Sequence, residues 1–185
     1  EMCIRDRVDI SRGLHAFSIV GLPDKAVEEA RDRVSAAIKN SGLDSPKQKN
    51  HKIVISLAPA DLRKEGPIFD CAIALAYLLA CEEIAFDPTG KLFLGELSLD
   101  GTFRAVRGIL PIVRAAAELG FTEVYVPAEN AQEGALIDGV RVYGIHTLDE
   151  LLRHLDINRT DHKQLEPQPK TPVRYERPSY TVDLS

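Results

Sequence analysis

The connection between a strand-like run and an apolar helix reads Leu57-Ala58-Pro59-Ala60-Asp61-Leu62-Arg63-Lys64-Glu65-Gly66-Pro67-Ile68-Phe69-Asp70. The run before it, residues 53–57, is almost continuously apolar, which predicts a strand buried on both faces. The residues at its end and beyond, 69–80, are apolar and predict a central helix. The stretch therefore joins two elements that we expect in the core.

Before this stretch the pattern predicts two short strands and a helix. Residues 8–10 and 16–20 alternate between apolar and polar side chains, with a turn between them. Gly21-Leu22-Pro23-Asp24 then opens a helix, in which Pro23 fits the first turn and Asp24 complements the positive helix start. Gly42 ends that helix.

After the stretch, strands and helices alternate. The predicted strands are 92–97, 103–106, 123–126 and 140–143, and the predicted helices are 108–119, 128–134 and 148–155. Asp100-Gly101 is typical of a hairpin turn, and Thr147 of a helix cap. A strand-rich start followed by alternation predicts the α/β class, in a two-layer α+β arrangement.

The chain divides into three parts. Its 185 residues suit one domain with a tail. Residues 1–7 fit no pattern, and we expect them to be a non-native, artefactual start; the domain is predicted over residues 8–156. Residues 157–185 are polar and proline-rich, which predicts a stiff linker that does not order itself. A linker in this place leads us to expect that the chain is a piece of a longer protein.

Composition excludes several classes of protein. The hydrophobic share is 44%, the charged share 28% and the net charge -5, which gives no support to a strongly nucleic-acid-binding domain. No apolar run is long enough to cross a membrane, and no charged and apolar pattern marks a signal peptide, so we expect neither. The three cysteines, Cys3, Cys71 and Cys81, form no CxxC pair, so we expect reduced thiols in the cytoplasm and no metal site.

Two sequence motifs partly match known phosphate-binding sites. Gly90-Lys91 lacks the rest of a Walker loop, because Ala85 and Leu92 stand where glycine and a hydroxyl belong, so it predicts a turn before a strand. Gly21 to Asp24 opens a helix that could bind an anion, but Asp24 already fills that role. We therefore expect no cofactor in this chain.

A local run of basic residues is the remaining candidate for binding. Such a run is usually a solvated face, and contact with phosphate or a partner is the alternative. The candidate residues for contact with DNA or a partner are Lys47, Lys49, Lys52, Arg63 and Lys64.

The second half of the chain resembles the protease domain of the Lon family. The resemblance is carried by residues 95–101, 106–111, 115–120 and 124–130. In that family a serine follows the Gly-Pro of a Lys-Asp-Gly-Pro motif, and a lysine serves as its base. Here Ile68 follows Lys64-Glu65-Gly66-Pro67, and Leu110 stands at the lysine position. Neither aliphatic side chain can attack a carbonyl or accept a proton, so no catalytic residue is expected.

Two other side chains could stand in for the missing pair. Lys64 lies in a charged loop, where we expect a solvated amine, and Ser98 is expected to be structural.

A narrower resemblance covers residues 8–156. It rests on residues 8–14, 33–42 and 57–66, and on Phe17-Ser18-Ile19-Val20-Gly21-Leu22-Pro23-Asp24-Lys25-Ala26-Val27. These segments are similar to the N-terminal domain of the YifB/ComM family of magnesium-chelatase-like AAA+ ATPases. The resemblance implies the fold shared by Lon protease and a ribosomal small-subunit protein, with a mixed sheet covered by helices.

The same resemblance implies a role for the longer protein. It would be a homo-hexamer driven by ATP and Mg²⁺, bound in an ATPase domain outside this chain, and a DNA helicase that promotes branch migration in natural transformation. The chain itself would be a non-catalytic accessory domain that assembles the ring or contacts DNA. Two alternatives stay open: a peptidase or pseudo-peptidase that binds polypeptide, and an interaction module without a ligand.

Overall fold

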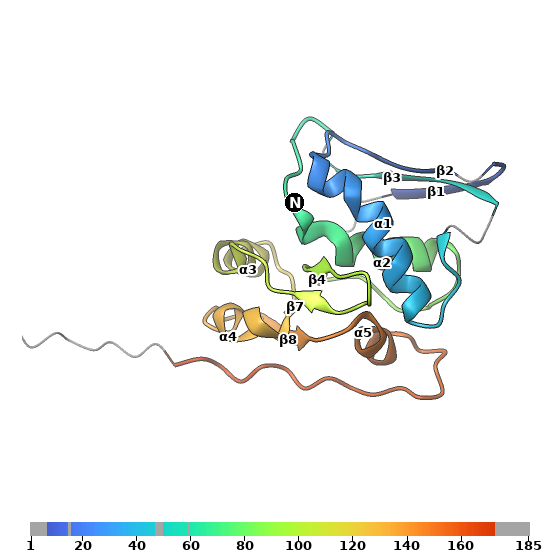
Figure 1. The fold of residues 1–185 in the computed structure, drawn as a ribbon. Coiled ribbons are helices and arrows are strands. Elements are labelled where there is room, and N and C mark those ends of the chain that lie inside the picture. Colours follow the sequence, from blue (N-terminus) through green and yellow to red (C-terminus); the bar gives the residue numbers. More distant parts are fainter. Residues whose placement is uncertain (1–6, 15, 47–49, 59, 173–185) are drawn as a thin grey trace, which may run out of the picture.

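The computed structural model describes residues 7–14, 16–46, 50–58 and 60–172 (Figure 1). In chain order the elements are β1 (Arg7–Arg12), β2 (Ala16–Val20), α1 (Lys25–Asn40), β3 (His51–Ser56), η2 (Pro67–Phe69), α2 (Asp70–Ala80), β4 (Lys91–Phe93), β5 (Glu96–Leu97), β6 (Phe103–Arg104), α3 (Ile109–Glu118), β7 (Glu123–Pro127), η3 (Ala128–Asn130), α4 (Ala131–Gly134), β8 (Arg141–Ile145) and α5 (Leu148–Leu155). Residues 1–6 of the predicted artefactual start lie outside the described part, and β1 begins at Arg7, one residue before the predicted strand.

The strands form two sheets and a hairpin. The first sheet has the order β1-β3-β2, with β3 antiparallel to β1 and parallel to β2. The second sheet, β4-β7-β8, is entirely parallel, and β5 and β6 form an antiparallel pair across the Asp100-Gly101 turn. Helices cover the sheets, with α1 and α2 between the first sheet and the rest of the molecule (Figure 1). The predicted α/β class with two layers is confirmed.

Strand β3 corrects one prediction. Ile53 and Ile55 are fully buried against the helices, whereas Lys52 is exposed and Val54 is only half-buried. The strand is therefore covered on one face, because the described helices pack on one side of the first sheet. A continuous apolar run did not mean burial on both faces.

The helix boundaries follow the local chemistry. Asp24 caps α1 by accepting a hydrogen bond from the Val27 N–H, and Thr147 caps α5 in the same way with the Glu150 N–H. Gly42 follows α1 with a φ of 79°, as predicted. Pro23 lies before the cap rather than in the first turn.

The predicted strand 92–97 is two strands. Gly95 interrupts it with a φ of 150°, and the loop before α2 takes over its hydrogen bonds. The Gly95 N–H donates to the carbonyl of Ile68 at 2.9 Å, and the Gly95 carbonyl accepts from the Cys71 N–H at 3.2 Å. Gly95 thus ties the stretch between β3 and α2 to the second sheet.

The described part of the proline-rich tail, residues 157–172, is not separate from the domain. Residues 157–172, called the strap below, run along the second sheet and α4 (Figure 1). The Gln168 N–H donates to the carbonyl of Val142 in β8 at 2.7 Å. The expectation that this segment does not order itself is wrong for residues 157–172, because backbone hydrogen bonds, ion pairs to α5 and the packing of Leu165 on the core hold it against the domain.

Candidate functional site

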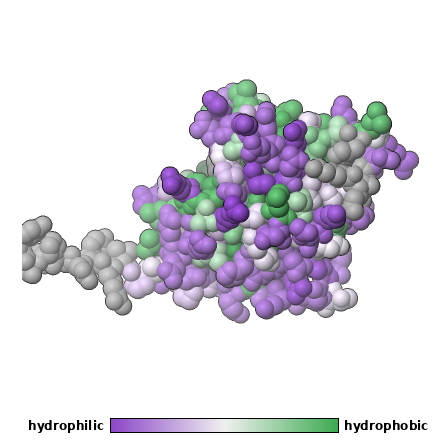
Figure 2. Space-filling model, viewed as in Figure 1, coloured by the Kyte–Doolittle hydropathy of each residue, from purple (hydrophilic) through white to green (hydrophobic). Residues whose placement is uncertain are grey.

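A cavity of about 620 Å³ opens between the loop after β3 and helix α3. Its wall is mainly apolar and includes Ile68, Val106 and Ile112, while Arg63, Glu96 and Arg107 supply charges. Figure 2 shows hydrophobic atoms gathered where the upper part of the molecule, which carries α1, meets the lower part, which carries α3 and α4. We call this cavity the cleft.

Asp24 holds the loop that forms one wall of the cleft. Its Oδ2 accepts a hydrogen bond from the Gly66 N–H at 2.9 Å, and its own N–H donates to the carbonyl of Lys64 at 2.9 Å. Partial burial acts to raise the pKa of Asp24, but the N–H groups of Val27 and Gly66 outweigh it, so the pKa lies below its usual value. The start of α1 is therefore occupied by its own carboxylate, as the sequence predicted.

Asp70 and Arg33 fix the helix that follows the loop. Asp70 begins α2 with its side chain fully buried, and the Arg33 Nε donates to its Oδ2 at 2.6 Å. The same oxygen accepts from the Leu97 N–H at 3.1 Å. Burial raises the pKa of Asp70, and the Arg33 guanidinium opposes that rise. The ion pair thereby positions η2, and with it Ile68, against the cleft.

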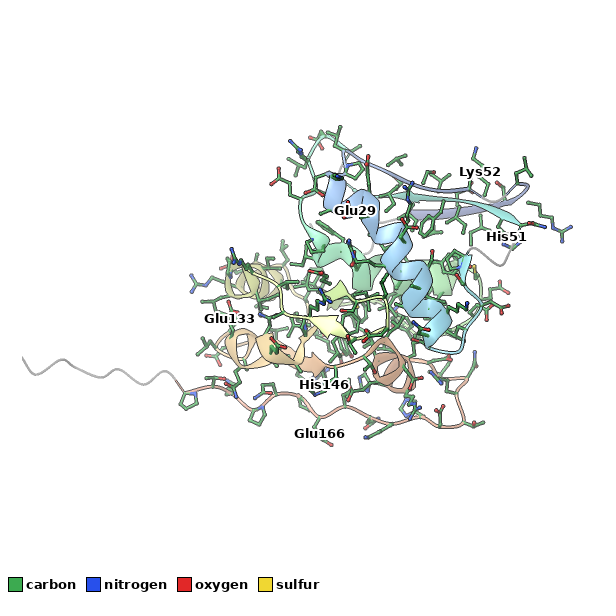
Figure 3. The ribbon with its side chains drawn as sticks, in the orientation of Figure 1. Glu29, His51, Lys52, Glu133, His146 and Glu166 are labelled. Atoms are coloured by element: carbon green, nitrogen blue, oxygen red, sulfur yellow. The ribbon has the colours of Figure 1, made fainter. Side chains whose placement is uncertain are left out.

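The two positions of the Lon-type dyad do not meet in the cleft. Ile68 lines the cleft and packs on the apolar cluster around α3. Leu110 is not among the residues that line it; its N–H donates to Glu133 Oε1 at 3.1 Å, beside α4 (Figure 3). From α3, Ile112 lines the cleft instead. The cleft therefore has an isoleucine at the position of the nucleophile, and the residue at the position of the base does not line it.

Lys64 contradicts the sequence interpretation. It is 6% exposed, lines the cleft, and its Nζ donates to the carbonyl of Leu62 at 2.7 Å. The expected solvated amine is wrong, because the backbone of Lys64 bridges to Pro23 and draws the residue into the domain. Ser98 lies at the β5–β6 turn, where its N–H donates to the carbonyl of Thr102, so its structural role is supported.

The basic run does not form one surface. Lys47 and Lys49 lie outside the described residues. Lys52 is at the start of β3, far from α3 in Figure 3, whereas Arg63 follows the end of that strand and lines the cleft. A strand of this length separates its ends by roughly 15 Å. Of the three candidates that the structure describes, Lys52, Arg63 and Lys64, only Arg63 is both exposed and at the cleft.

The cleft can bind an apolar group, but its described wall offers little for catalysis. Its lining contains no serine, threonine, cysteine or histidine among the residues that the structure describes. Cys71 is buried next to it in α2, and burial raises the pKa of its thiol. Among the described residues, no group of three or more potential ligands could hold a metal ion.

Sequence reasoning missed Glu96 and Arg107 at the cleft. Glu96 follows Gly95 and Arg107 precedes Gly108, and only the folding of the second half onto the loop after β3 brings them there. No local pattern indicates this placement. Among the described helices, none has the length and apolar character of a membrane span.

The comparisons with known proteins agree with the geometry. Residues 7–130 match the family model described as subunit ChlI of Mg-chelatase. The chain belongs to this family. It is 45% identical over 144 residues to an uncharacterised protein of Mycobacterium tuberculosis, 36% over 150 residues to the competence protein ComM of Haemophilus influenzae, and 44% over 133 residues to the uncharacterised protein YifB of Escherichia coli.

These alignments cover 77%, 80% and 71% of this chain but only 28%, 29% and 26% of the relatives. The chain thus spans less than a third of their length. The predicted membership of the YifB/ComM group of magnesium-chelatase-like AAA+ proteins is confirmed.

Proposed function

We propose that this domain is a non-catalytic accessory part of a magnesium-chelatase-like AAA+ ATPase of the ComM type. The whole protein would be a cytoplasmic homo-hexamer that uses ATP to drive DNA branch migration during natural transformation. ATP and Mg²⁺ would bind in a part of the protein outside this chain. The domain would help assemble the ring or contact DNA.

The observation that carries this proposal is Ile68 in the wall of the cleft. The cleft lies where a Lon-type enzyme would hold its nucleophile, yet an aliphatic side chain faces it. The similarity to the competence protein ComM of Haemophilus influenzae supports the link to DNA uptake for the whole protein. The name of the family does not by itself imply metal chelation by this domain.

Arg63 and Lys52 are the described residues through which this domain would meet DNA. Both are exposed; Lys52 lies at the start of β3, and Arg63 lies in the loop that follows the strand. Lys64 is a weaker candidate than its sequence suggests, because its amine is buried. Two separated cations would each contact one phosphate, so their effects on affinity would add.

The test uses the intact parent protein with ATP and a branched DNA substrate. We expect ATP-dependent branch migration and no hydrolysis of casein. The variants Lys52→Ala and Arg63→Ala should each lower the salt dependence of DNA binding by about one unit of slope, with Lys25→Ala as an exposed basic control. Casein turnover that disappears in Ile68→Asp would overturn the proposal. Unchanged affinity and slope in the double variant would remove the DNA contact from this domain.

A second candidate is a polypeptide-binding domain without catalysis. The cleft favours it, because an apolar wall beside Arg63, Glu96 and Arg107 suits an apolar side chain flanked by charged residues. Binding of unfolded casein that is lost in Ile112→Asp and kept in Ile137→Asp, outside the cleft, would favour this candidate.

A further inference from the structure

The strap is fixed to the domain at several points. Its described backbone hydrogen bonds to the domain include the N–H of Ile157 to Ala85, of Lys163 to Arg153, of Gln168 to Val142 and of Thr171 to Ala135. The Thr171 hydroxyl also donates to the carbonyl of Gln132. Three ion pairs add to these bonds: Arg159 with Asp149, Asp161 with Arg153, and Lys170 with Asp138. Strand β8 is the edge of the second sheet, so the bond at Val142 covers backbone groups that the sheet leaves open.

The prolines of the strap suit this position. Pro167 and Pro169 flank Gln168, so the residue that donates to β8 stands between two that have no N–H. Proline also restricts the residue before it to extended backbone, which lowers the entropy lost on docking. Glu166 points away from the domain in Figure 3. The strap is therefore pre-shaped for the edge of β8, and its Leu165 side chain packs against the main apolar core.

His154 of α5 is the point at which the strap meets the core. The Leu165 N–H of the strap donates to His154 Nδ1 at 3.0 Å. Because a nitrogen that accepts an N–H carries no proton, the neutral ring is protonated at Nε2, which lies 3.1 Å from the Tyr125 hydroxyl. That hydroxyl donates in turn to Glu123 Oε2 at 2.9 Å. Both ring nitrogens are thus engaged in the neutral form.

The surroundings of His154 disfavour its charged form. The ring packs on Tyr125 and Tyr143, with centroids 5.7 Å and 5.5 Å away. Burial lowers the pKa of His154, and the positive charges of His162 on the strap and Lys91 on β4 lower it further. The carboxylate of Glu123 on β7 acts to raise it. Arg141 on β8 already neutralises Glu123 through a contact of 2.7 Å.

We propose that His154 is a latch that holds the strap against the domain while its ring is neutral and releases it when Nδ1 takes a proton. A protonated Nδ1 is a donor and faces the Leu165 N–H, which is also a donor, so the bond between them is lost. The other contacts of the strap, which include the Arg159–Asp149 and Asp161–Arg153 ion pairs, then loosen from that point. Release frees sixteen residues, 157–172, which can span roughly 50 Å when extended.

The lowered pKa of His154 sets the direction in which docking of the strap depends on pH. A histidine whose pKa is lowered in the folded chain stabilises the docked state at neutral pH, and that contribution is lost as the pH falls below the ordinary value of 6.5. The strap is therefore closed at pH 7.5 and opens on acidification.

The test is amide hydrogen exchange by NMR on the 185-residue chain between pH 7.5 and 5.0, corrected for intrinsic exchange. We expect protection of the Leu165 and Gln168 amides to fall about tenfold as His154 titrates, while the Tyr125 amide in β7 is unchanged. Titration of the imidazole with constant protection at Leu165 would overturn the latch.

Two variants separate the latch from general acid destabilisation. His154→Gln keeps a side-chain acceptor but cannot titrate, so its strap should stay protected at pH 5.0. His146→Gln changes an exposed histidine next to α5 and should behave like the unmodified chain. Equal loss of protection in His154→Gln and the unmodified chain would contradict the proposal. Should His154→Gln not fold, the imidazole and amide titrations of the unmodified chain decide alone.

Discussion

Arg33 grips the fully buried carboxylate of Asp70 with two hydrogen bonds, from Nε at 2.6 Å and from Nη2 at 3.0 Å. Nη2 also donates to the carbonyl of Ala26 in the first turn of α1, at 2.8 Å. One guanidinium therefore links the first turn of α1 to the first residue of α2. Because α2 begins at Asp70, this pair sets where the preceding loop enters the cleft.

Replacing Arg33 by methionine should destabilise the domain by about 3 kcal/mol, because a buried carboxylate loses its partner. The loss should shrink as the pH falls, since Asp70 then takes a proton and no longer needs a cation. Urea unfolding at pH 7 and pH 4 measures both effects. Arg31→Met, at an exposed position of the same helix, is the matched control and should change stability by less than about 0.5 kcal/mol. Equal effects of the two substitutions would show that the buried pair contributes nothing special.

Replacing Asp24 by alanine should cost about 1–2 kcal/mol, because the cap of α1 and the acceptor for the Gly66 N–H are lost together. Since the pKa of Asp24 is lowered in the folded chain, its contribution is present above the ordinary value of 3.8 and is lost as the pH falls through the folded pKa. The difference from the unmodified chain should therefore shrink as the pH falls below 3.8. Urea unfolding across pH 2–7 tests this, with the exposed neighbour Lys25→Ala as control.

Local chemistry explains which elements the sequence predicts well. Thr147 and Asp24 cap their helices with their own side chains, and Gly42 ends α1 in a conformation that few residues adopt. These signals lie within a few residues of the boundary that they set. The aliphatic residues Ile68 and Leu110 at the two dyad positions can be read from the sequence alone. That this domain lacks catalysis stays a prediction.

Long-range contacts explain what the sequence could not predict. Lys64 is buried because its backbone pairs with the Leu22–Pro23 turn, about forty residues earlier. Gly95 breaks a strand because the loop before α2 binds it from the other half of the chain. The strap docks because β8 offers an open edge, which exists only after the sheet has formed. Composition alone therefore indicated a free linker.

Gly21 should tolerate alanine far less well than Gly42. A Cβ on Gly21 would lie 2.2 Å from the carbonyl oxygen of Leu57, whereas one on Gly42 would meet nothing within 4 Å. Both residues have positive φ, at 108° and 79°, so either substitution strains the backbone. Only the alanine at Gly21 also clashes with a neighbour. We expect Gly42→Ala to cost about 1 kcal/mol and Gly21→Ala at least about 2 kcal/mol more. Thermal unfolding of the two variants measures the difference; similar melting temperatures would contradict the close approach of Gly21 to Leu57.

A hydroxyl placed in the cleft should not create a protease. In Ile68→Ser the new side chain faces an apolar wall, and the described lining holds no histidine to take its proton. Lys64 is the lysine in that lining, and its Nζ is already bound to the carbonyl of Leu62. Leu110, at the position of the Lon base, does not line the cleft and has no group that could take a proton. We therefore expect no casein hydrolysis by Ile68→Ser at pH 7 to 9, measured by release of acid-soluble peptide. Ile137→Ser, outside the cleft, controls for contaminating protease, and turnover in Ile68→Ser alone would show that the cleft still holds a working base.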